Sequence, residues 1–171
     1  MAYKESTVDY SGSARAALQF TVNALPLGAG DRAGDYVSSF GVLIPALVAT
    51  RGFQAFAGTM DRMGKSNVTE LDTVQNAAFA AQKWGCGNCW EHAAVAYMFL
   101  RRSGIRPIAL IGRTNHAFVM IGNDMRTAFD DPSSFPRNSW ICDAWGKQVY
   151  PARQYLAHES ERAAPVLVEM D

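Results

Sequence analysis

The pattern of hydrophobic and polar positions changes along the chain near Gly104. Before that residue, segments with apolar stripes and helix-forming residues are separated by glycine and proline, which predicts a series of helices. The predicted helices cover residues 13–24, 35–49, 52–63, from Asn67 or Thr69 to about residue 84, and 89–102, with breaks at Arg51-Gly52 and at Gly64. The last helix has few polar positions, so we expect it to be mostly buried.

Short runs rich in β-branched and aromatic residues follow Gly104 and are separated by turn residues. They predict strands over residues 106–112, 115–122, 138–145 and 147–150, and the segment 150–163 predicts a short closing helix. Helices followed by strands are typical of an α+β domain with an antiparallel sheet. We therefore expect a helical N-terminal half, with the buried helix 89–102 packed on a small antiparallel sheet.

A length of 171 residues predicts a single domain: a helical N-terminal portion (1–65), a core with the candidate chemistry (66–156) and a tail (157–171). Sixteen basic and sixteen acidic residues balance, so no long-range field favours nucleic acid or an anionic membrane. The longest apolar run, residues 40–49, is shorter than the roughly 20 residues of a bilayer span. We expect neither nucleic acid nor a membrane span.

The start of the chain is polar and predicts no cleaved secretory peptide. Three cysteines, an odd number, do not suit a disulfide framework, so we expect synthesis in a reducing compartment, the cytoplasm.

Residues 84–94, WGCGNCWEHAA, hold two of the cysteines and allow three interpretations. A structural zinc site needs four ligands, commonly two close pairs, and the chain offers one pair. A thioredoxin-like Cys-x-x-Cys motif follows a strand, whereas Cys86 follows a predicted helix. The third interpretation makes Cys89 a nucleophile, because free N–H groups and the dipole at a helix start favour a thiolate. Cys86 lies in the loop before the helix and lacks that assistance.

A catalytic thiolate needs a general base, and the base needs an acceptor that orients it. His116 begins the strand 115–122, and Asp143 lies in the next predicted strand. Adjacent antiparallel strands bring two such residues within a few ångströms. Asn138 is the alternative orienting residue.

The other titratable residues have simpler interpretations. We expect Cys142 to be a small buried side chain on the opposite side of the sheet from Asp143. Cys86 is a loop thiol that is near enough in sequence to modulate Cys89, and we expect His92 to pack or to cap its helix.

The segment CGNCWEHAA resembles the sequence around the catalytic cysteine of papain, in which Cys-Gly-Ser-Cys-Trp precedes a helix. Residues 115–122 resemble the histidine strand of papain, and residues 138–140 resemble its asparagine segment. The later spacing resembles the transglutaminase-like branch more closely, because Trp140 and Asp143 match its Trp-x-x-Asp element. The similarity covers residues 70–156 and extends to short bacterial effector and toxin domains.

Two departures from papain favour the transglutaminase-like branch. The glutamine that donates to the oxyanion in papain-type peptidases is replaced here by Lys83, with Gln82 one residue out of register. The chain also lacks room for the second half-domain of those peptidases. Trp84 or a backbone group is then the alternative donor, and Asn88 is a further supporting candidate.

The resemblance implies a Cys-His-Asp enzyme without cofactor or metal, in which Cys89, His116 and Asp143 act on a protein substrate through a thioester. Glutamine deamidation, transamidation and proteolysis are all compatible with it, as is a bacterial effector or toxin that a dedicated system secretes into a target cell without a cleaved signal peptide. The sequence identifies no cognate chaperone or immunity protein. A non-catalytic binding module on the same fold and a Cys-x-x-Cys oxidoreductase are the alternatives.

Overall fold

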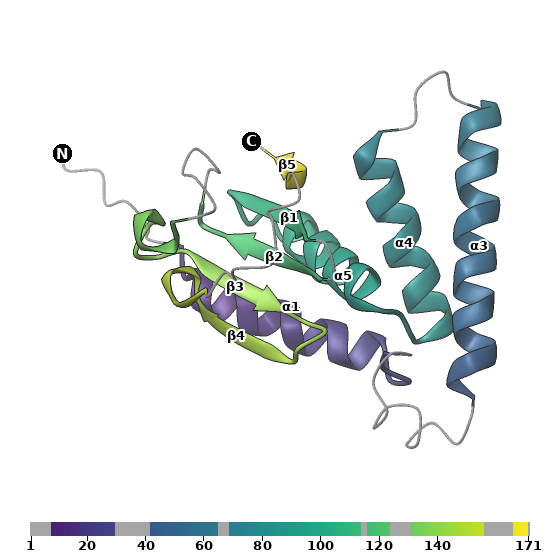
Figure 1. The fold of residues 1–171 in the computed structure, drawn as a ribbon, viewed down its shortest axis with the longest axis horizontal. Helices are drawn as coiled ribbons and strands as arrows, with labels where there is room; N and C mark the ends of the chain where they lie inside the picture. Colours follow the sequence, from purple (N-terminus) through teal and green to yellow (C-terminus); the bar gives the residue numbers. More distant parts are fainter. Residues whose placement is uncertain are drawn as a thin grey trace.

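The computed structural model describes residues 8–29, 42–64, 69–113, 116–123, 131–155 and 166–170 (Figure 1). Within these ranges the fold belongs to the α+β class, as the sequence predicts. The helices are α1 (Tyr10–Ala24), α3 (Leu43–Gly64), α4 (Glu70–Trp84) and α5 (Cys89–Arg102). The strands are β1 (Ile108–Gly112), β2 (Ala117–Ile121), β3 (Trp140–Asp143), β4 (Gln148–Pro151) and β5 (Val166–Met170). Two short 3-10 helices are η1 (Pro132–Ser134) and η2 (Ala152–Gln154).

The five strands form one antiparallel sheet in the order β4-β3-β2-β1-β5. Residues alternate between its two faces, as the pleat requires. Val119 packs in the large cluster that α1, α4 and α5 also build, whereas its neighbour Phe118 packs with Phe135 on the other face. The central strands β1 and β2 are buried along their whole length, which explains their nearly continuous apolar sequences.

Helix α5 lies at the centre of the molecule, between α4, α1 and strand β2 (Figure 1). Its side chains from Glu91 to Met98 are all buried. Such a helix needs apolar or small residues on every side, and this explains the run of alanines between His92 and Tyr97. The prediction of a mostly buried helix over 89–102 is therefore confirmed.

The turn between α4 and α5 determines where Cys89 lies. Helix α4 begins at the cap Thr69, whose hydroxyl accepts the backbone N–H of Asp72 at 3.1 Å. It ends at Gly85, whose φ of 70° lies in the left-handed region that favours glycine. The chain therefore reverses within a few residues and enters α5 at Cys89.

The predicted break at Arg51-Gly52 is wrong, because α3 continues through it to Gly64. Glycine costs about 1 kcal/mol in a helix interior but keeps its backbone N–H, so packing of α3 on α4 outweighs the cost. Pro45 lies in the first turn of α3, where its missing N–H has no helical partner to lose. Residues 35–41 and Asn67 lie outside the described residues.

The prediction of a tail over 157–171 is also wrong, because β5 pairs with β1 at the edge of the sheet. The short run Val166–Met170 depends on that long-range partner for its strand structure. The predicted closing helix is represented by η2 alone, and residues 156–163 lie outside the described ones. No helix among the described residues is long and apolar enough to cross a membrane.

Candidate active site

Cys89 is the first residue of α5, and its side chain is partly buried. Asn88 precedes it with extended backbone, φ −98° and ψ −164°, so the helix begins abruptly at the cysteine. The N–H groups of a first helical turn have no partners within the helix, and the positive end of the dipole lies there. Cys89 therefore lies at the positive end of the α5 dipole.

His116 and Asp143 form a hydrogen-bonded ion pair, with Nε2 of the histidine 3.0 Å from Oδ2 of the aspartate. The Asp143 side chain is 7% exposed and that of His116 is 25% exposed, so solvent screens the pair only in part. The carboxylate also accepts the backbone N–H of Gly146 at 2.8 Å and a weaker bond from Gln148 at 3.4 Å. Asp143 is thus held from several sides while it bonds His116.

The register of the sheet explains this contact. Strands β2 and β3 pair with Val119 opposite Cys142. Continued by one position, that register places Asp143 opposite Phe118 and diagonal to His116 on the same face of the sheet. Cys142 consequently faces away from the pair and packs in the helix-covered cluster with α5.

Aromatic rings enclose the imidazole on two sides. The Trp145 ring meets His116 edge-on at a centroid distance of 5.3 Å, and the Phe118 ring lies at 5.9 Å. These rings pack against the imidazole and cover part of its surface.

The pKa of His116 reflects the groups on both sides of its ring. Burial lowers the pKa of His116, but hydrogen bonds to Asp143 and to the Cys89 side chain, together with their negative charges, raise it to about 9. Burial likewise raises the pKa of Asp143, and the hydrogen bonds from His116 and Gly146 outweigh it and lower that pKa below its ordinary value. Cys89, His116 and Asp143 therefore form a continuous chain that favours an imidazolium beside a carboxylate.

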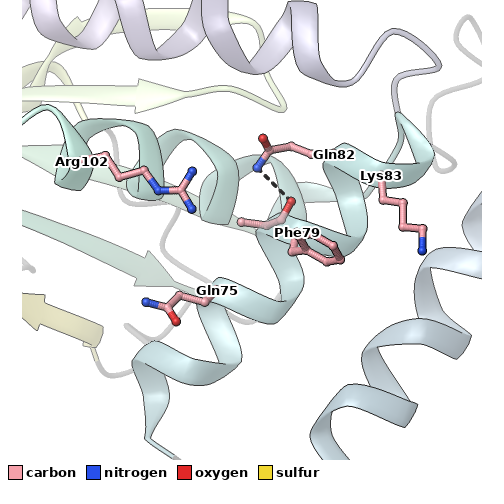
Figure 2. Close-up of a pocket in the computed structure, with 6 residues that line it drawn as sticks. Gln75, Phe79, Gln82, Lys83 and Arg102 are labelled. Atoms are coloured by element: carbon pink, nitrogen blue, oxygen red, sulfur yellow. Dashed lines mark hydrogen bonds between the residues drawn. The ribbon is translucent and has the colours of Figure 1, made fainter.

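Gln82 and Trp84 lie apart from this chain of contacts. The Gln82 side chain donates to the backbone carbonyl of Ala78 at 3.1 Å and lines a pocket of about 480 Å³ together with Phe79 and Arg102 (Figure 2). Trp84 ends α4 with 38% of its surface exposed, and Lys83 lies 5.8 Å from its ring centroid. Among the described residues, no hydrogen bond joins either side chain to Cys89 or His116.

Asn88 and Asn138 occupy very different places. Asn88 occupies the N-cap position of α5 beside Cys89, and its buried Oδ1 atom has no hydrogen-bond partner. Asn138 is exposed in the turn before β3. The structure therefore brings Asn88 to the nucleophile, and it gives the contact with His116 to Asp143 and not to Asn138.

The remaining cysteines are buried, and all three are free thiols. The Cys86 sulfur lies 3.5 Å from Oγ1 of Thr50, and burial raises its pKa. Burial also raises the pKa of Cys142, to about 12. The His92 ring stays on its own helix, with Nδ1 2.9 Å from the carbonyl oxygen of Asn88. Among the described residues, no group of three or more His, Cys, Asp or Glu side chains is placed to hold a metal ion.

Glu91 is a residue of the site that the sequence analysis missed. Its side chain is fully buried and accepts the backbone N–H of Asn88 at 2.8 Å. A glutamate three residues after an asparagine at a helix start is the second half of a capping box, and this signal is present in the sequence. Its contacts with Arg51 and Gln54 of α3 have no such local signal.

No protein-family model matches this sequence, and no curated protein sequence matches it.

Proposed function

We propose that this protein is a cysteine-dependent acyl-transfer enzyme, in which Cys89 is the nucleophile, His116 the general base and acid, and Asp143 the residue that orients His116. The observation that carries the proposal is the continuous chain of hydrogen bonds from the thiol at the helix start through the imidazole to a buried carboxylate. A nucleophile, a base and an orienting acceptor in this order are what covalent acyl transfer requires.

In the first half-reaction the Cys89 sulfur attacks the carbonyl carbon of the substrate, and the amine leaves with the proton that His116 carries. A thioester remains. Because Nε2 of His116 is bonded to Asp143, Nδ1 is the ring nitrogen that exchanges this proton. In the second half-reaction His116 takes a proton from water or from an acceptor amine, which attacks the thioester carbonyl and releases Cys89.

The negative charge that develops on the carbonyl oxygen needs hydrogen-bond donors. The backbone N–H of Cys89 is at the first position of α5, where it has no helical acceptor. The side-chain amide of Asn88 is the candidate second donor, because it lies at the adjacent cap position.

We place the enzyme in the papain-like and transglutaminase-like group. The support is the order of the three residues, with the cysteine at a helix start, the histidine before a strand and the aspartate at the end of the next strand. Trp140, three residues before Asp143, completes the similarity to the transglutaminase-like branch. A protein substrate, glutamine deamidation, transamidation or proteolysis as the reaction, and a role as a secreted effector or toxin are parts of this proposal.

Intact-mass analysis of candidate substrate proteins tests the reaction. After incubation with the wild-type protein, the small mass gain of an amide converted to an acid indicates deamidation, fragments indicate proteolysis, and cross-linked species indicate transamidation. The Cys89→Ala variant is the matched control, and every change must disappear with it. A change that persists in Cys89→Ala would contradict the assignment of the nucleophile.

A second test needs no substrate. We expect iodoacetamide to modify Cys89 at mild pH faster than it modifies a cysteine in an unfolded peptide, because a thiolate is the reactive form. Peptide mapping after partial modification assigns the reacted thiol, and the buried Cys86 and Cys142 serve as internal controls. A Cys89 that reacts only at the unfolded rate would favour a non-catalytic binding module.

A further inference from the structure

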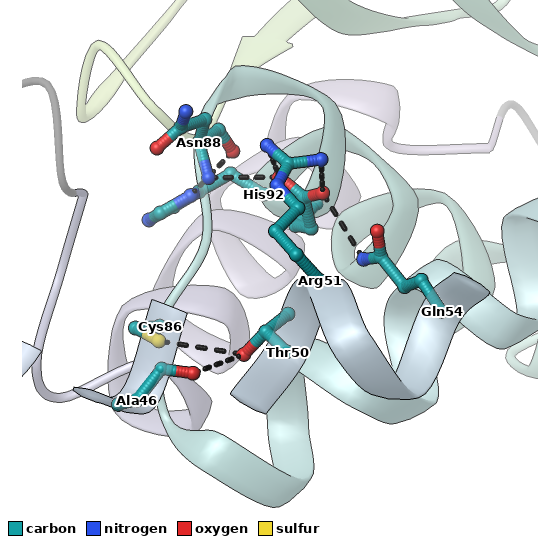
Figure 3. A network of polar contacts seen from close by, with 8 residues as sticks. Ala46, Thr50, Arg51, Gln54, Cys86, Asn88 and His92 are labelled. Atoms are coloured by element: carbon teal, nitrogen blue, oxygen red, sulfur yellow. Dashed lines mark hydrogen bonds and ion pairs between the residues drawn. The ribbon is translucent and has the colours of Figure 1, made fainter. Parts of the chain in front are cut away.

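Glu91 carries a buried carboxylate two residues after Cys89, and both of its oxygen atoms have partners. Oε2 accepts the backbone N–H of Asn88 at 2.8 Å. Oε1 lies 2.7 Å from Nη1 of Arg51 and accepts from Gln54 at 3.1 Å, while Nη2 of Arg51 lies 3.4 Å from Oε2. Figure 3 shows Arg51 and Gln54 reaching from α3 toward the start of α5.

A fully buried carboxylate is tolerated only when it is paired and hydrogen-bonded. The two-pronged contact with the Arg51 guanidinium provides the pairing charge, and the Gln54 amide provides a further hydrogen bond. Helix α3, far from α5 in sequence, therefore determines where the Glu91 carboxylate lies.

The position of this carboxylate determines the backbone that leads into Cys89. The Asn88 N–H that it binds belongs to the residue immediately before the nucleophile. Gly87 packs so closely on Glu91 that a Cβ atom at Gly87 would collide with the Cβ atom of Glu91. On its other side, the Gly87 N–H donates to the carbonyl of Gly28 at 3.2 Å. The loop before Cys89 is thus fixed between Glu91 and Gly28.

We infer that Glu91 is a positioning residue for Cys89, and that Arg51 and Gln54 of α3 hold it in the arrangement that aims the thiol at His116. The inference rests on the proposed role of Cys89 as the nucleophile. It gives α3, which lies outside the segment that resembles known cysteine enzymes, a part in the chemistry of the site.

The charge of Arg51 has a second effect. A lone carboxylate beside the start of α5 would repel a thiolate and oppose the helix dipole. The neighbouring thiol of Cys86 shows the two opposed effects: burial, most of all, raises its pKa, and of the two nearby charges Glu91 raises it and Arg51 lowers it. With Arg51 in place, the charge of Glu91 beside the start of α5 is paired.

The test compares Arg51→Met, Arg51→Lys, Gln54→Ala and Glu91→Gln with the wild-type protein. Three quantities are measured on folded protein: the rate of Cys89 alkylation by iodoacetamide against pH, the NMR titration of the His116 ring, and the melting temperature. Arg102→Met is the matched control, because it removes the same charge from the opposite end of α5.

We expect Arg51→Met and Glu91→Gln to slow the alkylation of Cys89 at neutral pH about tenfold, because small displacements of a reacting group have large effects on rate. Arg51→Lys should restore much of the rate by restoring the charge, and Gln54→Ala should have a smaller effect. Arg102→Met should react like the wild-type protein.

A merely structural role would lower the melting temperature and leave the alkylation profile and the His116 titration of the folded protein unchanged, and that result would overturn the inference. A wild-type Cys89 that reacts no faster than an unfolded cysteine would instead contradict the proposed function. If Glu91→Gln or Arg51→Met does not fold, Gln54→Ala decides, because it removes one hydrogen bond to Glu91 and leaves the ion pair between Arg51 and Glu91 in place.

Discussion

The start of α5 is contacted from two directions, and the two sets of contacts differ in chemistry. From the sheet come His116 and Asp143, whose ion pair is partly open to solvent on the histidine side. From α3 comes Arg51, which pairs with the buried Glu91. Each set holds one charged pair, but only the first contains an imidazole, a group that can give up and take back a proton during a reaction.

This difference separates proton transfer from positioning. The imidazole of His116 titrates with a pKa of about 9, within the range in which it can exchange a proton with a thiol. A guanidinium stays protonated at every accessible pH, so Arg51 can only provide a fixed charge and fixed geometry. Substitutions that disturb one set or the other should therefore have different consequences.

The largest effect should follow removal of the Cys89 sulfur, which both sets of contacts position. We expect Cys89→Ala to abolish turnover of the substrate found by intact-mass analysis, because no thioester can form. The fold should persist, since the side chain is only partly buried at the helix start, and circular dichroism and a melting curve check this. Wild-type turnover in Cys89→Ala would transfer the role to another group.

Replacing Asp143 should have the next largest effect. We expect Asp143→Ala to lower kcat by about 10⁴-fold, because the imidazole loses its orientation and its stabilising charge. Asn138→Ala is the matched control, and we expect a loss far below that, since Asn138 is exposed and Asp143 makes the contact with His116. Steady-state kinetics of both variants show which residue orients His116. A larger loss of kcat in Asn138→Ala than in Asp143→Ala would favour a papain-type arrangement.

These two sets of contacts also differ in how far the sequence predicts them. The helix start at Cys89 follows from the glycines before it, and the diagonal contact of His116 with Asp143 follows from adjacent antiparallel strands. Both depend on local patterns and on the pairing of neighbouring strands. The contact of Glu91 with Arg51 joins residues 40 positions apart on two helices, and no local pattern predicts it.

Gln82 lies on α4, where its side chain lines a separate pocket, and its supporting role stays a prediction. The error over the C-terminal segment has the same origin as the missed contact of Glu91 with Arg51. Strand β5 depends on its pairing with β1 across a long sequence separation, so five residues that include Glu169 carried too little local signal.

Substitution of Gly146 or Gly87 should disturb one set of contacts each, with effects that are smaller than those above and similar in size. A Cβ atom at Gly146 would collide with the Asp143 carboxylate, and one at Gly87 would collide with Glu91. We expect either alanine variant to lower the free energy of unfolding by about 1–3 kcal/mol, as overpacking does. In the folded proteins, Gly146→Ala should lower the pKa of His116 and Gly87→Ala should instead slow the alkylation of Cys89. Urea unfolding, NMR titration and alkylation rates measure these effects, and identical profiles for both variants would contradict the division into two sets.

The pH dependence of stability should follow the ion pair of His116 and Asp143 on the sheet. The pKa of His116 is raised to about 9 from an ordinary 6.5, so its contribution to folding is complete below about pH 6.5 and is lost as the pH rises through about 9. The pKa of Asp143 is lowered, so its contribution is present above the ordinary value of 3.8 and is lost as the pH falls below it. We expect the melting temperature of the wild-type protein to fall between pH 7 and 10 more steeply than that of His116→Gln. Parallel curves would contradict the raised pKa.

The smallest effect should come from a glycine that touches neither set. Gly52 lies inside α3, next to Arg51, and a Cβ atom there would meet nothing within 4 Å. We therefore expect Gly52→Ala to stabilise the protein by about 0.5–1 kcal/mol, because alanine loses less backbone freedom in a helix than glycine. The same variant should leave Cys89 alkylation and the His116 titration unchanged, since the Arg51 side chain keeps its position. A stabilised protein with an altered Cys89 rate would show that the rigidity of α3, and not only its contacts with Glu91, affects the nucleophile.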